Sequence, residues 1–145
     1  MRKMEEKAAE FLEKQRVAIL SVVLPTGEVH GAAMHFAVGD RPLKIYFSTE
    51  KGSLKYAAVA GNGTGEAGVV VGFSEAEWVT LQMRGKITEA SGNEAEVAWG
   101  LILEKYPGAA SHRSDKSTVL AFVPGWYRYS NLAAQPPEII TAQDL

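Results

Sequence analysis

The chain has 145 residues, of which 46% are hydrophobic and 22% charged, a balance typical of a globular protein with one domain over residues 1–145. A net charge of −2 argues against nucleic-acid binding, which depends on a basic surface, and the absence of cysteine excludes disulfides and thiolate metal sites. Because the N-terminus lacks a signal-peptide apolar region and no apolar stretch reaches membrane-spanning length, we expect a cytoplasmic protein that does not enter a membrane.

The first half of the chain is predicted to begin with a helix and to continue as an antiparallel meander. Apolar residues at helical spacing, with Glu and Lys between them, indicate an amphipathic helix over Met4–Gln15. Val17–Leu24 is apolar almost throughout, which favours a strand buried on both faces. Proline and glycine mark turns at residues 25–27 and 39–42. The three strands expected here are Val17–Leu24, Val29–Val38 and Leu43–Ser48.

The second half is predicted to contain three further strands and two helices. Asn93 can cap the longer helix, Glu96 stands at its capping-box position, and Pro107 ends it. Pro124-Gly125 predicts a break or bulge in the last strand. The tail from Ala133 is expected to be extended and available to lie on a partner subunit. The elements are a helix over Ser53–Ala60, strands over Val69–Phe73 and Trp78–Ala90, a helix over Glu94–Tyr106 and a strand over Ser117–Tyr129.

Six strands joined mainly by hairpins predict a mostly β fold, a small antiparallel barrel with peripheral helices.

The segment Phe47–Tyr56, FSTEKGSLKY, carries the clearest chemical pattern. A strand ends in the hydroxyls of Ser48 and Thr49, and a helix opens with Ser53 and Lys55 in its first turn. Hydroxyl, ammonium and free backbone N–H groups together favour an anion site, since a cation in the first helical turn is otherwise unfavourable. The alternative is a serine N-cap followed by solvated lysines.

Other motifs argue against several kinds of site. Gly63, Gly65 and Gly68 match G-x-G-x-x-G, but they lead from a helix into a strand, so we interpret them as a flexible loop and not as a dinucleotide fingerprint. His30 and His35 are an odd number of residues apart and face opposite sides of a strand, so no metal site is predicted. His35 is either a half-buried barrel residue or a hydrogen-bonding group in a ligand cleft. No nucleophile with a base and an orienting acid is found, and no catalytic residue is assigned.

The order of these elements resembles the pyridoxamine 5′-phosphate oxidase-like, FMN-binding split β-barrel proteins, especially their general-stress-protein and nitroimidazole-resistance relatives. The similarity covers nearly the whole chain, and its most specific parts are FST-x-x-x-S-x-K and the strand that ends in R-G-K-I. It implies a six-stranded antiparallel split barrel that forms a homodimer, with the flavin in a cleft between subunits.

The resemblance also implies a set of FMN-binding residues. Those that would hold the phosphate are Ser48, Thr49, Ser53 and Lys55. Those that would line the isoalloxazine are Met34, His35 and Phe47 on adjacent strands, Gln82 on the long strand, and Trp126 from the partner subunit.

The implied function is a flavin-dependent oxidoreductase that acts on an unknown small molecule, with a nicotinamide or another reductant as hydride donor. The chain ends in QPPEIITAQDL, without the Trp-x-x-Arg-Leu motif and basic residues of pyridoxamine phosphate oxidases, which argues against the vitamin B6 reaction itself. The alternatives are a carrier or sensor of flavin, of the deazaflavin F420 or of haem, and a barrel that has lost its cofactor. Haem would need an axial histidine, for which His30, His35 and His112 are available.

Overall fold

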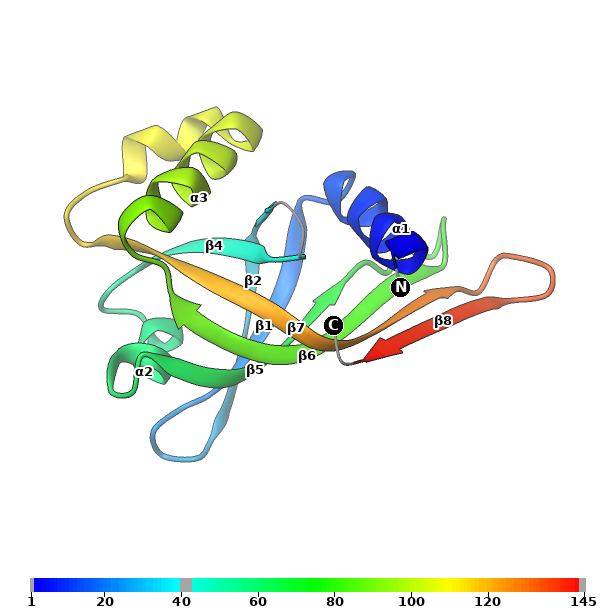
Figure 1. Ribbon diagram of the computed structural model, residues 1–145, viewed down its shortest axis with the longest axis horizontal. Helices are drawn as coiled ribbons and strands as arrows, with labels where there is room; N and C mark the ends of the chain where they lie inside the picture. Colours follow the sequence, from blue (N-terminus) through cyan, green and yellow to red (C-terminus); the bar gives the residue numbers. More distant parts are fainter. Residues whose placement is uncertain (1, 40–42, 144–145) are drawn as a thin grey trace.

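The computed structural model describes residues 2–39 and 43–143, the first four of these by their backbone alone. An antiparallel sheet curls around an apolar core, and the helices lie on its outside (Figure 1). The helices are α1 (Arg2–Glu13), α2 (Leu54–Ala60), α3 (Gly92–Lys105) and the 3₁₀ helix η1 (Pro107–His112). The strands are β1 (Val17–Val23), β2 (Val29–His35), β3 (Ala37–Val38), β4 (Ile45–Glu50), β5 (Thr64–Val71), β6 (Val79–Glu89), β7 (Ser117–Asn131) and β8 (Glu138–Gln143).

The strands follow the order β2-β1-β5-β6-β7-β4-β3, and β8 pairs with β7. β2 and β4 contact each other but are not hydrogen-bonded neighbours, so the barrel is split between them. The prediction of a mostly β, antiparallel split barrel with peripheral helices is confirmed. The described residues contain eight strands instead of six, because the strand predicted over Val29–Val38 is interrupted at Phe36 and the tail forms β8.

Two clusters of buried side chains hold the fold together. The larger cluster fills the barrel and includes Leu20, Phe47 and Phe122, which are fully buried. The smaller cluster includes Tyr46 and Trp99 and lies between α3 and the strands β4 and β7. Because neighbouring strand residues point to opposite faces, Tyr46 and Phe47 belong to different clusters. β4 is therefore covered on both faces, and α3 packs directly against it.

A bulge sets the curvature of the long β6–β7 ladder. The register shifts so that Arg84 pairs with Trp126 while Gly85 pairs with Pro124, which leaves Gly125 as the extra residue. A Cβ atom on Gly85 would lie 2.1 Å from the carbonyl oxygen of Val123, so only glycine fits there. The bulge predicted at Pro124-Gly125 is confirmed.

Several predicted boundaries are wrong. The Gly63–Gly68 segment is not a flexible loop, because β5 begins at Thr64 and pairs with β6 along its whole length. The N-cap of α3 is Ser91, not Asn93, and its side chain makes no capping hydrogen bond. The tail forms β8 on β7 of its own chain, in the hairpin that projects at the right of Figure 1. The turn predicted at residues 39–42 lies, after Gly39, outside the described residues.

β1 is not buried on both faces as predicted. Its residues alternate, and Val17, Ile19 and Val23 are 48, 43 and 43% exposed. Val29 of β2 and Val70 of β5 are exposed beside them, at 74 and 40%. We call the side of β1, β2, β5, β6 and β7 that points away from the barrel core the outer sheet face. One row of register partners across it is Ala33, Ile19, Val70, Gln82 and Arg128.

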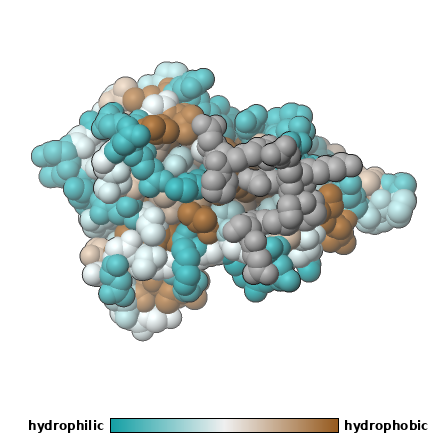
Figure 2. All heavy atoms as spheres, in the orientation of Figure 1, coloured by the Kyte–Doolittle hydropathy of each residue, from teal (hydrophilic) through white to brown (hydrophobic). Residues whose placement is uncertain are grey.

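The exposed β-branched residues of β1, β2 and β5 form an apolar strip on this face, which is accessible to solvent in the single chain. Figure 2 shows a different pattern on the coloured part of the face that it presents, where apolar patches are separated by hydrophilic residues.

Candidate functional site

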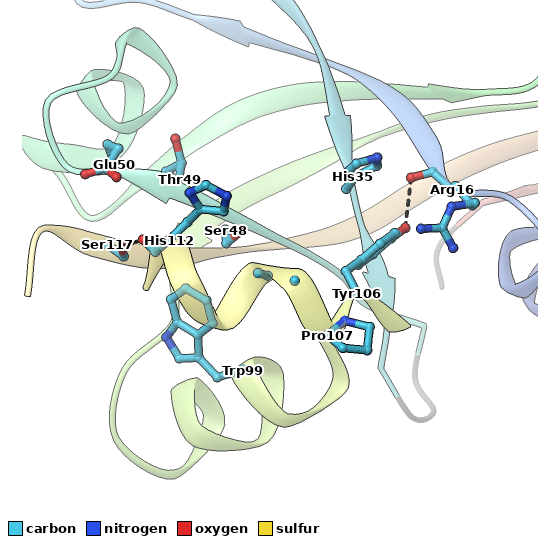
Figure 3. Close-up of a pocket in the computed structure, with 12 residues that line it drawn as sticks. Arg16, His35, Ser48, Thr49, Glu50, Trp99, Tyr106, Pro107, His112 and Ser117 are labelled. Carbon is cyan, nitrogen blue, oxygen red and sulfur yellow. Dashed lines mark hydrogen bonds between the residues drawn. The ribbon is translucent and has the colours of Figure 1, made fainter. Parts of the chain in front are cut away.

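A cavity of about 600 Å³ opens between the barrel and the α3–η1 segment (Figure 3). The barrel contributes Ser48, Thr49 and Glu50 from β4 and His35 from the end of β2. A smaller extension of about 60 Å³ reaches between His35, Ser48 and Tyr106. The residues that line the main cavity are Arg16, His35, Ser48, Thr49, Glu50, Trp99, Tyr106, Pro107, Gly108, Ala109, His112 and Ser117. We call this cavity the β4–α3 cleft.

Tyr106 closes one end of the cleft and ties α3 to the barrel. Its hydroxyl group donates to the carbonyl oxygens of Phe36 and Arg16, each at 2.8 Å, and one proton serves both acceptors. Burial raises the pKa of the Tyr106 phenol, so the group stays a donor at neutral pH. The His35 ring stacks on Tyr106, with 4.7 Å between centroids and 20° between planes. The Arg16 guanidinium lies 4.7 Å from the same ring centroid.

The start of α3 is also fixed to the barrel. Glu94, in the first turn of α3, accepts from Lys44 at 2.7 Å and from the hydroxyl of Tyr46 at 3.2 Å. The hydrogen bond from Lys44 holds the pKa of the Glu94 carboxyl below its usual range. Lys44 precedes β4 and Tyr46 belongs to it, so the start of α3 is held over β4, while Tyr106 holds its end to Phe36 and Arg16. The roof of the cleft is therefore a fixed part of the fold.

Hydroxyl groups gather at the other end of the cleft. Thr49 lines the cavity, and its Oγ1 lies 2.9 Å from the Oγ of Ser53. The Ser53 hydroxyl accepts from the backbone N–H of Tyr56 at 3.3 Å, so Ser53 is the N-cap of α2. Ser53 is therefore the serine N-cap that was the alternative to an anion site, and its hydroxyl is also linked to the cleft through Thr49. Lys55 is half-buried on the first turn of α2 and is not among the lining residues.

The structure separates the residues assigned to the isoalloxazine. Phe47 is fully buried in the barrel core, and Met34 packs against that core. His35 points the other way and lines the cleft. Met34 and Phe47 therefore cannot share the cleft with His35 through their side chains, since successive strand residues face opposite sides. Of these three residues only His35 lines the cleft, and the role of Met34 and Phe47 at a flavin stays a prediction.

Gln82 and Trp126 lie on the outer sheet face, away from the cleft of their own chain. Gln82 is exposed between the buried residues Leu81 and Met83. Trp126 is half-buried next to the buried Tyr127, and its ring lies 4.1 Å from the Arg84 guanidinium carbon. Neither residue lines the β4–α3 cleft.

The flavin site predicted from the sequence contains none of the residues that α3 and η1 contribute to the cleft. In the sequence analysis Tyr106 is only the last residue of the predicted helix Glu94–Tyr106, and His112 is only a possible haem ligand. Arg16 carries no sequence signal, because it is one charged residue between a helix and a strand. The Tyr-Pro pair at the end of α3 was the one local indication that the chain turns there and exposes new side chains.

The described residues provide neither a metal cluster nor a membrane-spanning helix. No group of three or more His, Cys, Asp or Glu side chains in them is arranged to hold a metal ion. None of the described helices is long and apolar enough to cross a membrane.

Solved structures with this fold include a haem-binding protein from Mycobacterium smegmatis, with a TM-score of 0.78 and 11% identity. The match covers 97% of this chain and 57% of that one, so the chain spans little more than half of that protein. A relative of general stress protein 26 from Clostridium acetobutylicum has a TM-score of 0.68 and 18% identity over 99% of this chain and 96% of its own. General stress protein 26 from Bacillus anthracis has a TM-score of 0.68 and 16% identity over 96 and 98% of the two chains.

At these identities the likeness shows the fold alone. No curated protein matches the sequence. Residues 4–131, however, match the family model of pyridoxamine 5′-phosphate oxidase, which covers most of the chain. The chain belongs to the pyridoxamine 5′-phosphate oxidase family.

Proposed function

We propose that this protein binds flavin mononucleotide in the β4–α3 cleft and works as a flavin-dependent oxidoreductase on a small molecule. The proposal is carried by one observation: Ser48, Thr49 and His35, all chosen from the sequence, line the same cavity of about 600 Å³ in a member of this family. Cofactor sites commonly fall in the range of about 300–1,000 Å³.

The chemistry of the lining supports this ligand. The hydroxyls of Ser48 and Thr49 lie at one end and are donors for a phosphate ester. The Tyr106 and His35 rings at the other end are flat surfaces for a conjugated ring system (Figure 3).

Glu50 lines the hydroxyl end and opposes an anion there, so the phosphate needs a cation beside it. We assign that role to Lys55, because it follows the cap residue Ser53, whose hydroxyl is bonded to Thr49. Bound flavin would supply the hydride and electron transfer, and the chain would bind and orient it.

We also propose that the working form is a homodimer joined through the outer sheet face. The exposed residues Val17, Ile19 and Val70 would be covered by a second copy, which removes apolar surface from water. The same face bears Gln82 and Trp126, which lie outside the cleft of their own chain. These two residues can contribute to a flavin site only in a second copy.

The first test is the visible spectrum of the purified protein, with mass spectrometry of any small molecule released on denaturation. Flavin bands and a released molecule with the mass of FMN are expected. A released molecule with the mass of F420 would show that the deazaflavin occupies the site instead of FMN. A colourless protein that binds neither FMN, F420 nor haem when they are added would refute the cofactor proposal.

The phosphate assignment is tested with Lys55→Ala and the matched control Lys51→Ala, an exposed lysine of the preceding turn. We expect roughly tenfold or greater loss of FMN affinity in Lys55→Ala alone, since a charge-assisted hydrogen bond is lost. Equal affinities in both variants would remove Lys55 from the site.

Turnover separates an enzyme from a carrier. Stopped-flow mixing of the flavin-loaded protein with NADH, NADPH or reduced F420 should bleach the flavin bands if the protein is an oxidoreductase. A flavin that none of these donors reduces would assign the protein as a non-catalytic flavin carrier or sensor.

Haem binding is a second candidate, favoured by a different observation. His35 and His112 both line the β4–α3 cleft, and imidazole is a common axial ligand of haem iron. The third histidine, His30, faces the opposite side of β2 from His35 and does not line the cleft. Added haem should give a Soret band that is lost in His35→Ala or His112→Ala if this candidate is correct, and FMN should then fail to bind.

A further inference from the structure

The end of the β4–α3 cleft that contains Arg16 differs in charge from the hydroxyl end. Arg16 follows α1 and precedes β1, and its backbone carbonyl is held by the Tyr106 hydroxyl. The side chain is thereby directed to the Tyr106 ring, where the guanidinium carbon lies 4.7 Å from the centroid. Figure 3 shows Arg16, His35 and Tyr106 together at this end, with Glu50 at the other.

Arg16 is exposed, and its guanidinium forms no ion pair within the part of the chain that the structure describes. Ion pairs there join other residues, and none includes Arg16. Burial, and after it the nearby Arg16 charge, lower the pKa of Lys105, whereas Glu13 acts in the opposite direction.

Lys105 itself is engaged elsewhere. Its ammonium group donates to the carbonyl oxygen of Gln15 at 2.6 Å and lies over the Phe36 ring at 4.2 Å. It lines a separate cavity of about 310 Å³ together with Glu13 and Glu104. Arg16 is therefore the permanent cation that the β4–α3 cleft presents at its aromatic end.

We propose that this end of the cleft binds the carboxylate group of the small-molecule substrate, with Arg16 as the residue that selects it. The inference rests on the proposed function in one respect, namely that the flavin phosphate occupies the opposite, hydroxyl end. His35 lines the same end of the cleft and supplies a second hydrogen-bond donor for the carboxylate.

The charge balance favours a carboxylate over a phosphate dianion. One guanidinium neutralises one negative charge, and its planar fork matches the two oxygens of a carboxylate. A second negative charge would find no further Lys or Arg side chain among the residues that line the cleft.

Arg16→Gln is a suitable test because the hydrogen bond between residue 16 and Tyr106 is made by the backbone of residue 16. The Tyr106 hydroxyl bonds the carbonyl oxygen of Arg16, which the substitution retains. Arg16→Lys keeps the charge but loses the planar fork, and Lys14→Gln removes one charge from an exposed position that does not line the cleft.

The probes are benzoate, its neutral analogue benzamide, and phenyl phosphate. Their dissociation constants are measured by titration calorimetry and ligand-observed NMR, on the flavin-loaded protein and on protein freed of flavin. We expect benzoate to bind wild type at least roughly tenfold more tightly than benzamide, and Arg16→Gln to abolish that difference. Arg16→Lys should be intermediate, and Lys14→Gln should match wild type.

Three results would overturn the proposal. Equal binding of benzoate and benzamide, or unchanged benzoate affinity in Arg16→Gln, would remove the carboxylate site. Tighter binding of phenyl phosphate than of benzoate would replace the carboxylate by a phosphate. Release of FMN by benzoate would assign Arg16 to the flavin. Protein that binds no flavin but discriminates between the probes would instead refute the flavin proposal and leave the carboxylate site standing.

Discussion

Replacing Tyr106 by phenylalanine removes the one hydroxyl that ties the end of α3 to the strands of the barrel. Tyr106 is 8% exposed, and its hydroxyl donates to the carbonyl oxygens of Phe36 and Arg16 at 2.8 Å each. One shared proton corresponds to one hydrogen bond in net terms, about 0.5–1.5 kcal/mol, and the buried carbonyl of Phe36 adds part of its desolvation cost. We therefore expect the free energy of unfolding to fall by about 1–2 kcal/mol.

Urea denaturation measures that change, and a loss of this size lowers Tm by roughly 2–8 °C in a domain of this length. The control is Tyr129→Phe, which retains the edge-to-face contact of that ring with Phe11 and removes a hydroxyl that bonds no described residue. Hydrogen exchange adds a local readout, because the amides in the last turn of α3 should exchange faster in Tyr106→Phe only. If both variants are equally stable and exchange alike, the Tyr106 hydroxyl does not hold α3, and the fixed roof of the cleft is refuted.

Three further predictions follow from burial and charge. Phe47→Ala should lower the free energy of unfolding by about 3–5 kcal/mol, whereas Ser48→Ala on the other face should change it by less than about 1 kcal/mol; equal effects would place Phe47 outside the core. Because the folded-state pKa of Glu94 is lowered by Lys44, its contribution is present above the unfolded pKa and is lost as pH falls through the folded pKa. Glu94→Gln should therefore cost about 0.5–1 kcal/mol at pH 7 and nothing once wild type is protonated, as urea titrations at several pH values can establish; a difference that persists in acid contradicts the ion pair. Val70→Asp should shift the protein from dimer to monomer in analytical ultracentrifugation without unfolding it, and an unchanged mass would exclude the outer sheet face as the interface.

Local pattern was sufficient for most of the fold. The amphipathic helix, the strand over Trp78–Ala90 and the bulge at Pro124-Gly125 were predicted from neighbouring residues, and the Ser53 cap was the stated alternative to an anion site. The errors arose where pairing with another segment decides the state. The Gly63–Gly68 segment is a strand because β6 lies beside it, although glycine disfavours strands.

The candidate site was predicted in part for the same reason. Ser48, Thr49 and Ser53 lie within six residues of one another, so a short motif contains them together. Phe47 was included because it belongs to that motif, yet the pleat directs it into the core.

The sequence by itself determined the antiparallel β class, the turn at residues 25–27 and the hydroxyl end of the cleft, because these depend on side-chain periodicity and on residues close in the chain. Only the tertiary structure brought Arg16, His35 and Tyr106 together, since they come from three separate elements and meet through one hydroxyl and two ring contacts. Contacts at such separations depend on strand register and on the packing of α3 over β4, and a one-residue slip would turn each strand residue to the opposite face. For this reason the charge at the aromatic end of the cleft could not be predicted from any local stretch of the chain.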